Sequence, residues 1–362
     1  MKKALTRWIK NMAVLGSVAL CLWCVGAKFQ TWATEEGGDA LLFAAGMKAQ
    51  AASQTPGTEP SPSPEETAQA EQTNQYQLPD DGVVSLTEAL EPQGQATPDP
   101  NRNSAPVEEI QLEGGAQVGT FYVKDTTNSG TDLNAALEEE PSVHLKCDGS
   151  VEILIYHTHT SEAYSTSYTG FYYTDMETRT SNQDQSVVAA GEELKRSLEA
   201  AGFGVVHDTT VNDSLYNGSY DRSWEVLQKN LAEYPTIQVT IDVHRDSMTT
   251  ESGVKYKPTA TINGRKAAQV MLLAGCDADG GWGDFPLWEE NLRLDLRVQE
   301  KLQELYPGLA RPMSFSNSKY NMNATTGSML VEVGTEVNTV SEARYAGQLV
   351  GEALAQVLKE CK

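Results

Sequence analysis

Hydrophobic and polar positions beyond residue 119 follow two alternating periods. Short apolar or β-branched runs have strand length, and longer segments between them repeat apolar residues every three or four positions, as one face of a helix does. The predicted strands are 151–156, 203–207, 236–243, 259–262, 267–274 and 328–333, and the predicted helices are 186–201, 220–234, 289–306 and 341–359. This alternation predicts an α/β domain with a largely parallel twisted sheet flanked by helices.

Residues at the ends of these segments support the boundaries. Gly202 follows the first predicted helix and Pro235 follows the second, and both residue types end helices. Asn263-Gly264 is a strong signal for a two-residue hairpin turn. Ser341 is a plausible N-cap for the last helix.

The first 30 residues have the pattern of a membrane-export segment. Four basic residues lie within the first ten positions, and an uncharged apolar run follows at residues 12–27. No convincing cleavage site follows that run. We therefore expect residues 1–30 to be a short cytoplasmic tail and an uncleaved signal anchor, with the rest of the chain on the other side of the membrane.

Residues 31–118 are rich in Pro, Gln, Ser, Thr and acidic residues and contain few basic ones. Such a sequence cannot bury enough apolar surface to offset its ordering entropy, so we predict a disordered linker before a folded domain at 119–362. The linker contributes to the net charge of −23. A strongly acidic chain without a basic patch is a poor nucleic-acid binder, and we expect no nucleic-acid partner.

Residues able to bind a metal stand at the ends of three predicted strands. His157, His159 and Glu162 follow the first strand of the folded domain. His244 follows the third strand, and Glu332 interrupts the apolar run of the last. Each residue alone would be an ordinary satisfied or solvated polar group. Because the carboxyl ends of parallel strands meet at one edge of a sheet, the coincidence across three strands favours a metal site.

The donor types favour zinc. Two imidazoles and one carboxylate, with a fourth position open, form a catalytic zinc arrangement, and although iron or manganese accept the same donors, zinc is the default for hydrolysis. The predicted ligands are His159, Glu162 and His244, with His157 as a supporting or reserve ligand. Glu332 is the predicted general base, because a carboxylate in an apolar strand has a raised pKa.

Four segments carry a resemblance to a known family. In chain order they are LIYHTHTSEAY, VVAAGEELKRSLEAAG, TIDVHRDS and SMLVEVGTEVNTVSEA. Together with the anchor and spacer, they resemble the stage II sporulation protein P family over about residues 119–362. The chain is more distantly similar to the zinc-dependent N-acetylmuramoyl-L-alanine amidases, which implies an amidase/phosphorylase-like fold.

The amidase resemblance implies roles for particular residues. The two strand-end histidines and the C-terminal Leu-Val-Glu-Val-Gly glutamate of those amidases correspond to His159, His244 and Glu332. Their remaining ligand is a glutamate early in the first helix, and no glutamate stands at that place in this chain. The third ligand is therefore open between Glu162, which we favour, and Asp184.

The family implies a reaction and a setting. The reaction is hydrolysis of the amide between the lactyl group of N-acetylmuramic acid and the L-alanine of the stem peptide, with cross-link cleavage open as an added activity. The setting is septal peptidoglycan degradation and engulfment during sporulation, from a single-pass anchor in the mother-cell membrane with the catalytic domain extracytoplasmic and facing the septum. Stage II sporulation proteins D and M are the expected partners.

One further residue and two other functions complete the hypotheses. Arg245 is a candidate to bind a stem-peptide carboxylate or the developing oxyanion, and its alternative is a salt bridge with Asp246. The chain could instead be a non-catalytic wall-binding or scaffold module, or a metal-dependent peptidase or small-molecule amidohydrolase. Presence of His159, His244 and Glu332 together argues against a purely binding role, because binding needs no general base.

Overall fold

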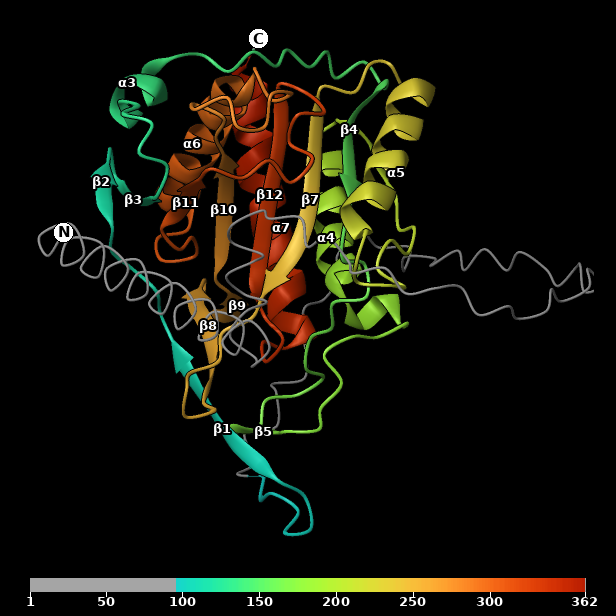
Figure 1. Ribbon diagram of the computed structural model, residues 1–362, viewed down its shortest axis with the longest axis vertical. Helices are drawn as coiled ribbons and strands as arrows, with labels where there is room; N and C mark the ends of the chain where they lie inside the picture. The colour runs from blue at the N-terminus through green and yellow to red at the C-terminus, as the bar shows by residue number, and fades with distance from the viewer. Residues whose placement is uncertain (1–95, 362) are drawn as a thin grey trace, which may run out of the picture. The chain divides into compact units, whose positions relative to one another are not determined.

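The computed structural model describes residues 96–361 (Figure 1). The predicted anchor at 1–30 and most of the predicted linker lie outside the described residues. Within the described range, no helix is both long enough and apolar enough to cross a membrane.

The strands are β1 (Ser104–Ile110), β2 (Ala116–Val118), β3 (Phe121–Asp125), β4 (Val151–Tyr156), β5 (Phe171–Tyr173), β6 (Gly204–His207), β7 (Val239–Asp246), β8 (Lys255–Ile262), β9 (Arg265–Ala268), β10 (Val270–Gly275), β11 (Met313–Ser316) and β12 (Gly327–Thr335). The helices are α3 (Leu133–Glu138), the 3-10 helix η1 (Gln183–Gln185), α4 (Val187–Ala200), α5 (Ser219–Glu233), α6 (Trp288–Leu305) and α7 (Val340–Glu360).

The larger sheet has the strand order β2-β3-β11-β10-β12-β7-β4-β6. Neighbours pair in parallel except at β2–β3 and β10–β12, which are antiparallel. The predicted α/β class with a largely parallel sheet is confirmed. A smaller sheet has the order β5-β1-β8-β9.

Helices cover both faces of the larger sheet (Figure 1). Ile153 and Ile155 of β4 belong to the main core, which also contains the apolar residues of α4, α6 and α7. Leu154 and Tyr156 belong instead to a second cluster with Leu227 of α5. Because side chains of a strand point alternately to opposite faces, the continuous apolar run of β4 is buried on both sides.

Three sequence boundaries are corrected by the structure. The folded part begins before residue 119, because β1 and β2 lie in the predicted linker. The predicted strand 267–274 is divided at Gln269, since β9 pairs with β8 in the small sheet and β10 pairs with β12 in the large one. The N-cap of α7 is Thr339 rather than Ser341, and Thr339 and Glu342 form a reciprocal capping box.

Candidate active site

Strands β4, β7 and β12 are neighbours in the larger sheet, and their carboxyl ends lie together. In register, Glu332 of β12 pairs with His244 of β7, and Asp242 of β7 pairs with Tyr156 of β4. His159 lies three residues beyond β4, and its ring centroid is 5.3 Å from that of His244, at nearly a right angle. The three strand ends thus converge as the sequence pattern predicts.

The period of β7 decides which side chains face this site. Ile241 and Val243 are part of the main core, on the face that carries α4 and α7. Asp242 and His244 alternate with them and therefore point to the opposite face, on which α5 lies. The sequence predicts His244 just after its strand, but β7 continues to Asp246, so His244 is held inside a paired strand.

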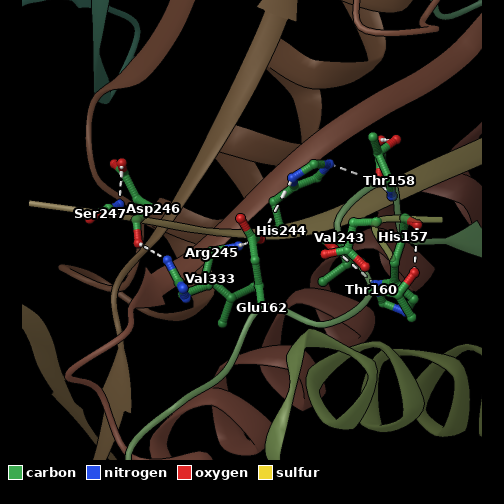
Figure 2. Close-up of polar contacts among 12 residues, drawn as sticks. His157, Thr158, Thr160, Glu162, Val243, His244, Arg245, Asp246, Ser247 and Val333 are labelled. Carbon is green, nitrogen blue, oxygen red and sulfur yellow. Dashed lines mark hydrogen bonds and ion pairs between the residues drawn. The ribbon is translucent and has the colours of Figure 1, made fainter. Parts of the chain in front are cut away.

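Carboxylates lie on both sides of the His244 imidazole. Its Nε2 atom is 2.9 Å from Asp242 Oδ1 in an ion-pair contact, and its Nδ1 atom is 3.8 Å from Glu162 Oε2. Figure 2 shows His244 and Glu162 facing one another, joined by a dashed line. Burial alone would lower the pKa of His244, but the charges of Asp242 and Glu162 outweigh it and raise the pKa to about 10.

Asp242 is itself firmly held. Its carboxylate is fully buried and accepts hydrogen bonds from the Thr158 backbone N–H at 2.8 Å and the Thr158 hydroxyl at 2.6 Å. A carboxylate behind an imidazole fixes the orientation of the ring, an arrangement that commonly supports metal-binding histidines.

His159 and Glu162 are also buried. The His159 ring stacks on Tyr216 at 5.0 Å and meets the Tyr220 ring edge-on at 5.7 Å. Burial lowers the pKa of His159 to about 3, so the ring is neutral, the form that binds metals. Glu162 Oε2 accepts a hydrogen bond from the Arg245 backbone N–H at 3.1 Å, and burial raises its pKa.

Glu332 Oε2 and Tyr220 Oη are buried in this site and have no hydrogen-bond partner among residues 96–361. Burial, together with the negative charge of Asp246, raises the pKa of Glu332 to about 8. Burial also raises the pKa of Tyr220. Buried polar atoms in native proteins normally have partners, so both atoms are suited to face water, a cation or a substrate.

The donor types fit zinc, although the side chains are not pre-arranged around an ion. The 3.8 Å between Glu162 Oε2 and His244 Nδ1 is close to the roughly 3.3 Å that separates two ligands in a tetrahedral zinc site. Within the described range, however, no three His, Cys, Asp or Glu side chains are positioned to hold a metal as they stand. His159 and Glu162 supply ligand groups as they stand, and His244 becomes one when it loses the proton that Asp242 and Glu162 stabilise. The ligand role of all three residues stays a prediction.

The His157 ring contacts groups other than the predicted ligands. Its Nδ1 atom lies 2.9 Å from the Val243 carbonyl oxygen, and its Nε2 atom lies 2.8 Å from His207 Nε2. His207 in turn contacts Glu192 Oε2 through Nδ1 at 3.2 Å. Both nitrogens of His157 are therefore engaged away from His159 and His244.

Arg245 is placed differently from either sequence hypothesis. It is buried, and its Nε and Nη2 atoms donate to the carbonyl oxygens of Ala163 and Thr178 at 3.0 and 2.7 Å. The Asp246 carboxylate pairs instead with Arg311, at 3.0 Å. Arg245 thus braces the loop after β4, and its geometry disfavours substrate binding.

Asp184, the alternative third ligand, lies outside the site. Its side chain is 88% exposed and contacts Arg344 of α7 at 3.3 Å. Glu162 is the carboxylate that the fold brings to His244.

Sequence reasoning missed Asp242 and a group of tyrosines. Asp242 carried a signal, because it lies two residues before His244 on a strand and must share its face. The tyrosines Tyr216, Tyr220 and Tyr320 carried none, since they come from two loops and the first turn of α5. Tyr220 stacks on His244 at 6.4 Å and lies 5.5 Å from Tyr320.

Side chains cover the site from solvent. His159, His244 and Glu332 are each less than a tenth exposed, and surface hollows near His144 and near Glu109 include none of them. Tyr216, whose ring stacks on His159, is about half exposed and forms part of this cover.

A family model described as stage II sporulation protein P matches residues 43–357. The stage II sporulation protein P of Bacillus subtilis (strain 168) is 28% identical to this chain over 218 residues. That match covers 57% of this chain and 50% of the relative, so the chain spans about half the length of the curated relative.

Two solved amidase structures are also similar in part. The CwlD amidase from Clostridioides difficile, solved in complex with the GerS lipoprotein, is 12% identical, with a TM-score of 0.35 over 58% of this chain and 99% of that one. The N-acetylmuramoyl-L-alanine amidase AmiC2 of Nostoc punctiforme is 13% identical, with a TM-score of 0.33 over 59% of this chain and 98% of that one.

Proposed function

We propose that this chain, which belongs to the stage II sporulation protein P family, is a zinc-dependent N-acetylmuramoyl-L-alanine amidase. Its substrate is the amide between the lactyl group of N-acetylmuramic acid and the L-alanine of the peptidoglycan stem peptide. The observation that carries the proposal is the convergence of His159, Glu162, His244 and Glu332 at the ends of neighbouring strands.

Three side chains would hold the metal: His159, Glu162 and His244. When bound, zinc supplies Lewis-acid chemistry, because it lowers the pKa of a water molecule and polarises a carbonyl. Asp242 keeps the His244 ring oriented through its 2.9 Å contact, and the Arg245 N–H holds Glu162 in place. These contacts limit the rearrangement needed on metal binding.

Glu332 acts as the general base and then as the general acid. Its unpartnered Oε2 accepts a proton from the attacking water as the water oxygen bonds to the carbonyl carbon. The same carboxyl group then passes this proton to the leaving amine nitrogen as the C–N bond breaks. Burial raises the pKa of Glu332 from the range of an ordinary glutamate toward neutral pH, where one carboxyl group can accept and then release a proton.

The cellular setting is proposed from the family and from the N-terminal pattern. The chain acts at the septum during engulfment, tethered by residues 1–30 in the mother-cell membrane, with stage II sporulation proteins D and M as partners. A linker of tens of residues lets an anchored domain reach tens of ångströms into the wall. Retention in membranes after an alkaline wash, and co-purification of D and M from solubilised membranes, are the expected results. Release by the wash would contradict the membrane anchor, and purification without D and M would contradict the proposed partners.

Digestion of purified peptidoglycan tests the reaction. We expect the full chain with zinc to release free stem peptides and leave peptide-free glycan, identified by mass spectrometry, and we expect a chelator or Glu332→Gln to abolish both products. Cross-link cleavage would appear as separated but still glycan-bound stem peptides. Intact peptidoglycan after digestion by the wild type would refute the amidase and favour a wall-binding scaffold.

A further inference from the structure

Tyr220 occupies a central place in the site that the proposed roles leave unexplained. It is the second residue of α5, and its ring lies 6.4 Å from the His244 ring, nearly parallel, and 5.7 Å from the His159 ring. Its hydroxyl is buried, with no hydrogen-bond partner among the described residues. A buried hydroxyl without a hydrogen-bond partner lowers stability, so its presence here needs a functional explanation.

The position of Tyr220 is tied to the network that orients His244. Asn321 Nδ2 donates to the Tyr220 carbonyl oxygen and to the Ser223 hydroxyl, both at 3.0 Å. The Ser223 and Thr158 hydroxyls lie 2.8 Å apart, and Thr158 donates to Asp242. The first turn of α5 is therefore fixed relative to the ends of β4 and β7, and the Tyr220 side chain is pre-positioned.

Glu332 Oε2 and Tyr220 Oη, which both lack a hydrogen-bond partner among the described residues, are chemically complementary. In its carboxylate form Glu332 is an acceptor through Oε2, and Tyr220 Oη is a donor, since a phenol with an ordinary pKa of about 10 is protonated at neutral pH. They are not hydrogen-bonded to each other. Amide hydrolysis requires an acceptor for the proton of water and a donor for the carbonyl oxygen that becomes negative.

We propose that Tyr220 is a catalytic residue whose hydroxyl donates a hydrogen bond to the scissile carbonyl oxygen and stabilises it as an oxyanion. This inference depends on the proposed amidase function. As the water oxygen bonds to the carbonyl carbon, the π pair moves to the carbonyl oxygen, and Tyr220 holds that oxygen without giving up its proton. When the C–N bond breaks, the pair returns to the C=O bond and the amine takes its proton from Glu332.

The test compares Tyr220→Phe with Tyr345→Phe in the full chain, with zinc and a soluble N-acetylmuramoyl-tripeptide as substrate. Tyr345 is a matched control, because it is a buried tyrosine on α7 whose hydroxyl already donates to the Ile262 carbonyl oxygen at 3.3 Å. We expect Tyr220→Phe to lower kcat about 100- to 1,000-fold, as loss of one oxyanion donor does, with KM changed less than about threefold. Tyr345→Phe should leave kcat unchanged.

Two readouts independent of activity complete the test. Tyr220→Phe should bind zinc with wild-type stoichiometry, and its Tm should equal or exceed that of wild type because an unpartnered buried hydroxyl has been removed. Tyr345→Phe should lower Tm because it loses a satisfied hydrogen bond.

The opposing outcomes are distinct. A Tyr220→Phe chain with unchanged kcat, beside an inactive Glu332→Gln chain, would overturn the role of Tyr220 and leave the amidase function standing. A raised KM with unchanged kcat, or loss of zinc, would equally overturn it, because Tyr220 would then bind the ground state or support the metal. A wild-type chain without hydrolysis would remove the amidase function itself, and the inference with it.

Discussion

Asp242→Asn is the sharpest test of how the fold prepares a metal ligand. Asp242 lies 2.9 Å from His244 Nε2 and accepts two hydrogen bonds from Thr158. Asparagine has nearly the same shape and keeps a carbonyl oxygen for the Thr158 N–H, but it lacks the negative charge behind the imidazole. The substitution therefore changes the electrostatics of His244 with little change in packing.

The expected loss of zinc affinity follows from the position of Asp242 behind His244, a proposed ligand. Loss of a carboxylate that supports a metal-binding histidine weakens metal affinity about 10- to 100-fold, which is about 1.4–2.7 kcal/mol. We expect the zinc Kd of Asp242→Asn to rise by a factor in this range, with binding retained because the three donor side chains stay. His159→Ala, which removes a donor, should instead fail to hold stoichiometric zinc.

Competition with a chromophoric chelator on the full chain measures this Kd, and thermal unfolding shows whether the variants fold. Asp208→Asn is the matched control: Asp208 is about half-buried and accepts from Asn230 at 2.8 Å, and it does not contact His244. Its zinc affinity should equal that of wild type. An unchanged Kd in Asp242→Asn would refute the supporting role, and an equal loss in Asp208→Asn would show a general charge effect instead.

Three more predictions concern catalysis and stability. Glu332→Gln should lower kcat about 100- to 10,000-fold with zinc content unchanged, since Gln cannot take the water proton; a loss of zinc would instead make Glu332 a ligand. Asp295 is fully buried on α6 with neither carboxylate oxygen bonded to a described residue, and burial raises its pKa well above the unfolded value. The folded chain therefore binds one proton more than the unfolded chain, and above about pH 4 the free energy of unfolding falls by about 1.4 kcal/mol per pH unit. Urea unfolding at several pH values should show this slope in the wild type and not in Asp295→Asn. Equal slopes in both chains would contradict the assignment. Gly347→Ala should lower the free energy of unfolding by about 1–3 kcal/mol, because its Cβ would lie 2.2 Å from the Ala190 carbonyl oxygen of α4; an unchanged Tm would show that the helices separate freely.

Much of the secondary structure was predictable because hydrophobic periodicity is a local property. The predicted strand 151–156 coincides with β4, and the predicted helix 289–306 differs from α6 by one residue at each end. The same local patterns predicted that His159, His244 and Glu332 belong to one site, since parallel strands end at a common edge. The two-residue period of β7 also places Asp242 on the same face as His244.

The choice among candidate side chains was not predictable in this way. The sequence favours Glu162 but leaves Asp184 open as the third ligand, yet in the fold Glu162 lies beside His244 and Asp184 pairs with Arg344 at the surface. His157 was a candidate ligand until the fold placed it against His207, fifty residues away along the chain. Such pairings depend on strand order and on loop paths, which no local pattern encodes.

The sequence by itself determined the elements of this protein, their α/β alternation and the strand ends that carry its chemistry. Tertiary structure alone decided that β10 runs antiparallel to β12, that Arg245 is occupied by backbone carbonyls, and that Tyr220 stands beside His159 and His244. The physical reason is the distance along the chain over which each kind of interaction acts. Periodicity, capping and turn preference act over a few residues, whereas the partners of a buried polar atom are set by packing between segments far apart in the chain.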